Sequence, residues 1–300
     1  MSSAPDQRIL SMVETLLDAA KALIRIRSAH AMQDFRRAVR PVYAVEDRGP
    51  NPRLKHAGTG VLLRIDGHPV IVTAAHVLDP LRHGVELSVG GLPGTRPVPI
   101  GGGVIRMTTP PQGNRLKDHV DTAFWKMPGN AVKALGNVWF VDPFRISHNR
   151  APVERRYYMA MGFAQSRNRK SIDNARRGIS NLISRYSGGV IEIPALAAEL
   201  GVPGTDHMFL NFEKRAQAED DTTIDAFTPT GLSGGPLLDL GDFVSEGAYS
   251  RETTHRASLS GILIEYHPKH KAVVAVKIGP IVAGIKKSLQ SAPQLPVGGN

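Results

Sequence analysis

The start of the chain has the hydrophobic pattern of one amphipathic helix. Between residues 6 and 38, apolar side chains recur every three or four positions, which places them on one face of a helix. These side chains are Ile9, Met12, Val13, Leu16, Leu17, Ala20, Leu23 and Ile24. Pro41 marks the end of the pattern. We predict a helical extension over residues 1–40, whose apolar face packs either on the body of the protein or on a partner.

After Pro41 the chain contains short apolar runs separated by turn residues. Asp66-Gly67 lies between the runs Thr59–Ile65 and His68–Ala74, which is typical of a β-hairpin. Similar runs are Val85–Val89, Val120–Lys126, Arg156–Met161, His207–Phe212, Pro236–Leu240, Leu259–Tyr266 and Ala272–Ile278. Many short strands without alternating helices predict an all-β barrel or sandwich. We expect a short helix over Gly279–Gln290 and a loose tail over residues 291–300.

The composition agrees with a folded protein of two domains. The chain has 300 residues, of which 41% are hydrophobic, and this is enough for a large core. Its 30 glycines and 22 prolines favour many turns. The absence of cysteine excludes disulfides, cysteine-based metal sites and a thiol nucleophile. We expect no metal or organic cofactor.

Charged residues bear on the location of the protein. Asp6, Arg8, Glu14 and Lys21 interrupt the first 25 positions, so that no apolar segment typical of a signal peptide is present. The late apolar stretch from Ala272 to Ile285 contains Lys277 and is too short to cross a bilayer. We expect a cytoplasmic protein with no membrane partner.

The net charge is +10, and much of it lies in the segment 145–186. Glu154 and Asp173 are the acidic residues of this segment. Its basic residues are Arg145, Arg150, Arg155, Arg156, Arg167, Arg169, Lys170, Arg176, Arg177 and Arg185. A basic segment can attract nucleic acid or an acidic partner, but no nucleic-acid motif accompanies this one. We therefore expect a solvated basic face and no nucleic-acid binding.

The segment Thr230–Pro236 is the first candidate for chemistry. Ser233 stands between glycines, which permit a tight turn that exposes its hydroxyl and lets backbone N–H groups converge on one point. An ordinary Ser/Gly turn is the alternative. The segment also fits the nucleophile elbow of α/β-hydrolases, but that motif needs a helix after the serine. Pro236 and the strand-like run after it exclude the elbow.

Two further residues complete a catalytic pattern. His76 follows an apolar strand with small residues before it, and Asp121 interrupts another apolar run. A buried acid needs a partner, and the Nδ1–H of a histidine is a natural one. The order His76, Asp121, Ser233 is that of chymotrypsin-type triads and differs from the order in subtilisin-type enzymes and α/β-hydrolases.

Together these motifs resemble the trypsin-like (chymotrypsin-fold) serine peptidase superfamily, and in detail its bacterial intracellular members. The motifs that carry the resemblance, within residues 43–285, are Gly58-Thr59-Gly60, Thr73-Ala74-Ala75-His76, Asp121-Thr122-Ala123, Gly231-Leu232-Ser233-Gly234-Gly235-Pro236 and Gly261-Ile262. The resemblance implies two six-stranded antiparallel β-barrels with the site between them. We place the first barrel at residues 41–135 and the second, with a basic insertion, at 136–290.

The resemblance also implies roles for individual residues. His76, Asp121 and Ser233 would be the catalytic residues of a serine endopeptidase, and the N–H groups of Gly231 and Ser233 would form the oxyanion hole. Thr122 stands where the family usually has a hydrophobic residue, so Asp118 is the alternative acid. Leu232 replaces the acid that pairs with a newly cut N-terminus in zymogen-activated members, so we do not expect that mode of activation.

Substrate contacts follow from the same resemblance. Phe227, six positions before the nucleophile, would set the base of the S1 pocket, unless a shifted loop places Asp225 there. Thr228 and Ile264 would also contact substrate, and Glu265 would select a basic residue at an outer subsite. We therefore expect weak or no cleavage of simple substrates with Arg or Lys at P1.

A different class of function stays open. The chain could be a catalytically idle member of the fold that acts as a protein-binding module. It would then use residues 6–38 or the basic segment 145–186, which are also where we would expect a regulatory partner of an active enzyme. The three triad residues favour the enzyme, because a scaffold does not need them.

Overall fold

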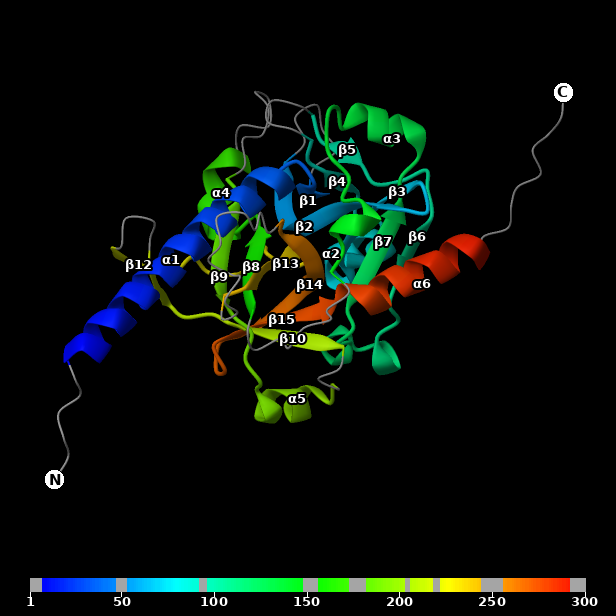
Figure 1. The fold of residues 1–300 in the computed structure, drawn as a ribbon. Coiled ribbons are helices and arrows are strands. Elements are labelled where there is room, and N and C mark those ends of the chain that lie inside the picture. Colours follow the sequence, from blue (N-terminus) through cyan, green and yellow to red (C-terminus); the bar gives the residue numbers. More distant parts are fainter. Residues whose placement is uncertain are drawn as a thin grey trace, which may run out of the picture.

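The computed structural model of the chain describes residues 7–46, 53–91, 96–147, 156–172, 182–202, 206–217, 222–243 and 256–291. Two antiparallel sheets make up most of this part, with a long helix at each end (Figure 1). The expected all-β class with an N-terminal and a C-terminal helix is confirmed.

The first sheet has seven strands, one more than expected, in the order β5-β4-β1-β2-β3-β7-β6. They are β1 (Val39–Val45), β2 (Leu54–Ile65), β3 (His68–Ala74), β4 (Leu87–Val89), β5 (Val98–Pro99), β6 (Ile105–Met107) and β7 (Thr122–Lys126). The predicted hairpin is present, because β2 and β3 pair up to Ile65 and His68. Asp66 and Gly67 between them both have positive φ, at 47° and 81°, as a tight hairpin turn requires.

The second sheet has the six strands expected, in the order β10-β15-β14-β13-β8-β9. They are β8 (Arg156–Gly162), β9 (Ser184–Gly189), β10 (His207–Asn211), β13 (Pro236–Asp242), β14 (Ser258–His267) and β15 (Ala272–Lys277). A bridge between Val190 and Leu210 joins its two edges, and the Ile191 N–H donates to the Phe209 carbonyl at 2.9 Å. These bonds close the sheet into a barrel.

Short elements lie between and beside the strands. A two-stranded ribbon consists of β11 (Arg215–Gln217) and β12 (Thr223–Asp225). The short helices are α2 (Ala75–Leu78), α3 (Gly129–Ala134), α4 (Gln165–Ile172) and α5 (Pro194–Leu200). The hydrophobic pattern did not predict these helices, and α2 contains His76.

The segment 137–147 connects the two sheets. Its Val141 bridges to Leu63 in the first sheet, and its Ile146 bridges to Leu259 in the second. The Ser147 N–H also donates to the Leu259 carbonyl at 2.8 Å. One hydrophobic cluster contains buried residues of both sheets, so the two sheets share a core.

The N-terminal helix α1 (Gln7–Phe35) packs on the body of the protein with its second half. Ala31 and Phe35 are buried, and the Arg27 guanidinium donates to the Leu240 and Asp242 carbonyls at 3.1 and 3.0 Å. Figure 1 shows its first turns extending beyond the strands. Of the expected apolar stripe, Leu23 and Ile24 pack against the core and Leu17 is 53% exposed, whereas the side chains of Ile9, Met12, Val13 and Leu16 lie outside the described residues.

The C-terminal helix α6 (Ile278–Ser291) buries one apolar face. Ile278, Ile281 and Ile285 are buried at helical spacing. In the part of the chain that the structure describes, no helix combines the length and the apolar character needed to cross a membrane.

The expected solvated basic face is wrong for several of its residues. Arg145 is only 8% exposed and donates to Asp34 of α1 at 2.8 Å. Arg156 pairs with the buried Asp239. Arg185 donates to the Ser28 carbonyl of α1 at 3.3 Å. Arg145 and Arg185 thus bind α1, and Arg156 binds the second sheet. The side chains of the other basic residues except Arg167 lie outside the described residues; they are Arg150, Arg155, Arg169, Lys170, Arg176 and Arg177.

Candidate active site

A cleft of about 590 Å³ is lined by residues that belong to both halves of the fold. The first half contributes His76 of α2 and the loop that contains Asp121. The second half contributes the turn around Ser233 and the residues Leu263–Tyr266 of β14. The three residues of the expected triad therefore line one cleft.

The pairing of β3 with β7 brings His76 and Asp121 together. Ala74, the last residue of β3, pairs with Thr122, the first residue of β7. The next peptide group along β3 continues this contact, because the Ala75 N–H donates to the Asp121 carbonyl at 2.8 Å. His76 thus lies just after the end of β3, and Asp121 lies just before the start of β7, where these two strands are paired.

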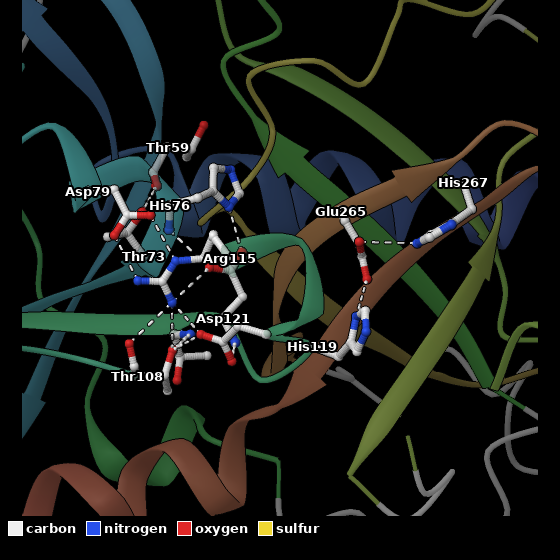
Figure 2. A network of polar contacts seen from close by, with 12 residues as sticks. Thr59, Thr73, His76, Asp79, Thr108, Arg115, His119, Asp121, Glu265 and His267 are labelled. Atoms are coloured by element: carbon white, nitrogen blue, oxygen red, sulfur yellow. Dashed lines mark hydrogen bonds and ion pairs between the residues drawn. The ribbon is translucent and has the colours of Figure 1, made fainter. Parts of the chain in front are cut away.

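The Asp121 carboxylate holds His76 by two hydrogen bonds. Its Oδ2 lies 2.5 Å from the His76 Nδ1, and its Oδ1 accepts the His76 backbone N–H at 2.9 Å (Figure 2). Asp121 is buried, whereas 38% of the His76 side chain is exposed. Donation from Nδ1 leaves the lone pair of the ring on Nε2.

Asp121 adopts a strained backbone conformation that its neighbours stabilise. Its φ is +33°, in the left-handed region, where a residue other than glycine typically costs about 1–3 kcal/mol. Its N–H donates to the Asp118 Oδ1 at 3.0 Å. Asp118, the alternative acid, therefore holds the Asp121 backbone, and the carboxylate that binds the His76 ring is that of Asp121.

Arg115 connects the segment after His76 with the loop before Asp121. Its Nε and Nη2 donate to the two carboxylate oxygens of Asp79 at 2.8 and 2.7 Å. Its Nη1 donates to Asp118 and lies 4.0 Å from Asp121 (Figure 2). The hydrogen bond from Arg115 lowers the pKa of Asp79. Arg115 was not among the predicted site residues, although Arg115, Asp118 and Asp121 recur at intervals of three.

The turn around Ser233 packs tightly against the first sheet. The Ser233 carbonyl accepts the Thr59 N–H at 2.8 Å, and the Gly234 N–H donates to the Leu263 carbonyl at 2.7 Å. Gly234 has a φ of +84°, and a Cβ there would lie 1.9 Å from the Thr59 carbonyl oxygen. Only glycine fits at this position, which explains why the motifs around Thr59 and Ser233 occur together.

Two peptide groups of the same turn have fixed orientations. The Thr230 carbonyl accepts the Gln165 N–H at 2.8 Å, and the Leu232 carbonyl accepts the Gly235 N–H at 2.7 Å. In a trans peptide the N–H of the next residue points away from the carbonyl. The N–H groups of Gly231 and Ser233 therefore point away from these two hydrogen bonds.

His56 lies directly behind Gly231 and is buried. A Cβ on Gly231 would lie 2.8 Å from the His56 Cε1. Burial lowers the pKa of His56 from its ordinary 6.5 to about 4, so the ring is neutral at pH 7. Between these two values the unfolded chain binds more protons than the folded one, so lowering the pH from 6.5 toward 4 reduces stability.

The expected substrate-binding residues are not all in one place. Ile264 and Glu265 line the cleft with His76 and Ser233. Phe227 instead packs on the Phe212 ring, with a centroid separation of 5.8 Å.

Contacts outside the cleft also surround Phe227. The Arg167 guanidinium lies 5.3 Å from the centre of the Phe227 ring. Neither Phe227 nor the exposed Thr228 is among the described residues that line the cleft, and Asp225 is exposed in β12. Phe227 thus belongs to an aromatic cluster of the second sheet, because its ring finds apolar partners there.

Within the described ranges, no group of His, Asp and Glu side chains has an arrangement that could hold a metal ion. A histidine held by a carboxylate next to a serine turn can support proton transfer and nucleophilic attack.

Comparison with known proteins gives structural likenesses at low sequence identity. No protein family profile matches the chain, and no curated protein sequence is similar to it. A serine endoprotease from Yersinia pestis aligns with 88% of this chain and 66% of its own, at 15% identity and a TM-score of 0.45. This chain thus spans slightly less than two thirds of that protein.

Two further solved structures are similar to the same extent. A Glu endopeptidase aligns with 85% of this chain and 91% of its own, at 13% identity and a TM-score of 0.46. The inactive form of a mutant of Rv3671c from Mycobacterium tuberculosis aligns with 88% and 93%, at 14% identity and a TM-score of 0.44. In its own two antiparallel sheets, with His76 and Asp121 beside the first and Ser233 beside the second, the chain has the trypsin-like serine peptidase fold that its motifs predicted.

Proposed function

We propose that the chain is a serine endopeptidase that hydrolyses peptide bonds through His76, Asp121 and Ser233. The observation that carries this proposal is the pair of hydrogen bonds from His76 to the buried Asp121, in a cleft that Ser233 also lines. Asp121 binds both the ring and the backbone N–H of His76 and has a strained backbone itself. A histidine with a purely structural role would not require this arrangement.

In the first step, the Ser233 hydroxyl attacks the carbonyl carbon of the substrate peptide bond. His76 Nε2 takes the hydroxyl proton, since Nδ1 is engaged with Asp121. The Asp121 carboxylate stabilises the imidazolium that forms. His76 then gives the proton to the leaving amine, and an acyl-enzyme with an ester bond to Ser233 remains.

The oxyanion of the tetrahedral intermediate would be bound by the N–H groups of Gly231 and Ser233. Their peptide planes are fixed by the hydrogen bonds of the Thr230 and Leu232 carbonyls, so little reorganisation is needed during the reaction. One such donor is typically worth about 2.7–4 kcal/mol in the transition state.

Water completes the reaction by the same route in reverse. His76 removes a proton from the water molecule, which attacks the acyl carbonyl and releases the acid product. The substrate would be a peptide or a protein, and the open cleft of about 590 Å³ between the sheets is compatible with such a chain.

Labelling with a fluorophosphonate probe tests the nucleophile. We expect the wild-type protein to be labelled and Ser233→Ala to be unlabelled, because the probe reacts only with an activated serine. Ser288→Ala, on α6 and outside this cleft, is the matched control and should be labelled like the wild type. Labelling of Ser233→Ala at the wild-type rate would overturn the proposal.

A further inference from the structure

The charges that line the cleft are not all compensated in the same way. The described lining includes three carboxylates, those of Asp118, Asp121 and Glu265. Asp118 accepts hydrogen bonds from Arg115 and from the Asp121 N–H, and Asp121 accepts the His76 N–H and lies 4.0 Å from Arg115. The contacts of Glu265 are with histidines, whose charge depends on pH.

Glu265 lies between two imidazole rings. Its Oε1 is 3.5 Å from the Nδ1 of His119, and its Oε2 is 3.2 Å from the Nε2 of His267 (Figure 2). His119 comes from the loop before β7, and its carbonyl accepts a hydrogen bond from the His207 ring at 2.7 Å. We call His119, Glu265 and His267 the Glu265 cluster.

The Glu265 cluster is accessible from the cleft and partly shielded from water. The Glu265 side chain is 32% exposed, and those of His119 and His267 are 19% and 21% exposed. On the neighbouring strand β15, Glu265 is paired with Val274, which carries no charge. A carboxylate in such a setting attracts cations more strongly than one on the open surface.

Charges around the Glu265 cluster act on its titration. Burial opposes ionisation of Glu265, but the contacts with His267 and His119 outweigh this and lower its pKa. The contact with Glu265 raises the pKa of His267, and the charge of Glu199 on α5 adds to this effect. Glu265 therefore has a negative neighbourhood when His267 is neutral and a cationic partner when His267 is protonated.

We propose that the Glu265 cluster is a subsite for a basic side chain of the peptide substrate, and that protonation of His267 weakens this preference. The proposal rests on the proposed peptidase function and names the substrate class that it favours. At alkaline pH the free carboxylate binds Lys or Arg. At acidic pH the His267 imidazolium competes for the carboxylate, and the preference weakens.

The effect of pH on the preference between two peptides distinguishes this subsite from a structural ion pair. A structural pair would hold the His119 loop against β14, and breaking it would weaken all substrates equally. The subsite changes the ratio between a lysine peptide and a matched uncharged peptide. That ratio is therefore the quantity to measure.

The experiment compares peptides that contain one lysine with peptides that contain norleucine, which has a similar shape without the charge, at each position in turn. Hydrolysis is measured with the wild-type protein, and binding is measured by fluorescence anisotropy with Ser233→Ala. We expect the Lys/norleucine ratio at one position to rise about fivefold or more from pH 5.5 to pH 8.5. In Glu265→Gln the ratio should be close to one at every pH.

Two further variants and the binding measurement complete the test. Glu192→Gln, an exposed acid elsewhere, should behave like the wild type. His119→Gln combined with His267→Gln should keep the lysine preference at pH 5.5. A ratio of one at every position, or a preference that Glu265→Gln leaves unchanged, would overturn the subsite. Selective binding without hydrolysis would support the subsite and refute the peptidase function, whereas hydrolysis without selectivity would do the opposite.

Discussion

Replacing Asp121 with asparagine is expected to lower kcat by about 10⁴-fold and to leave the fold intact, as loss of the triad carboxylate does in related chemistry. The asparagine oxygen can still accept one of the two N–H groups of His76. The amide NH₂ then faces the other, so the ring is favoured in the tautomer with its proton on Nε2. A ring in this form cannot take the proton of Ser233.

Peptide hydrolysis at saturating substrate measures this effect. Asp206→Asn, which changes an exposed acid outside the cleft, is the matched control and should keep the wild-type kcat. If Asp121→Asn stayed within tenfold of the wild type, Asp121 would not be the residue that sets the state of His76.

Replacing Arg115 with leucine is expected to destabilise the protein by about 3–5 kcal/mol at pH 7. The Arg115 side chain is 16% exposed, and its loss would leave the buried Asp118 without its cation and Asp79 with Arg82 alone, at 3.8 Å. Because Arg115 joins the segment after His76 to the loop before Asp121, kcat should fall as well. The stability of Arg115→Lys should lie between that of the wild type and that of Arg115→Leu, since lysine keeps the charge and loses the two parallel hydrogen bonds to Asp79.

Urea unfolding at pH 7 and pH 3 measures the stability effect. The pKa of Asp79 is lowered in the folded protein, so its contribution is present above the ordinary value of 3.8 and is lost as the pH falls through the folded value. The difference between the wild type and Arg115→Leu should therefore shrink at pH 3. Lys117→Leu, an exposed neighbour, is the control. A difference below about 1 kcal/mol at pH 7, the size of a surface pair, would contradict this account.

The sequence predicted those parts of the fold and site that depend on local pattern. The apolar runs around Asp66-Gly67 form the expected hairpin, because turn residues and strand residues are neighbours in the chain. His76, Asp121 and Ser233 each stand in a short motif, and the structure places all three at one cleft, as the prediction requires. The order of these motifs then indicated the fold, which the two sheets confirm.

The parts that the sequence did not predict depend on contacts between distant residues. Arg145 reads as one basic residue of a charged segment, yet it is buried beside Asp34, which lies far away in the chain. Phe227 was expected in the S1 pocket because it stands six positions before Ser233 in the sequence, but its ring packs against Phe212, outside the described lining of the cleft. Arg115 has no motif at all, and its role appears only when Asp79 and Asp118 are brought together.

Hydrolysis of a protein substrate by the wild type and by Ser233→Ala decides whether Ser233 is the nucleophile of a peptidase. We expect that the wild-type protein cleaves peptide bonds and that Ser233→Ala is slower by about 10⁶-fold, because the triad residues act as a unit. Thermal unfolding of both proteins shows whether the variant is folded, and Ser288→Ala should cleave like the wild type. Cleavage by a folded Ser233→Ala at the wild-type rate, or no cleavage of any peptide by the wild type, would contradict the account.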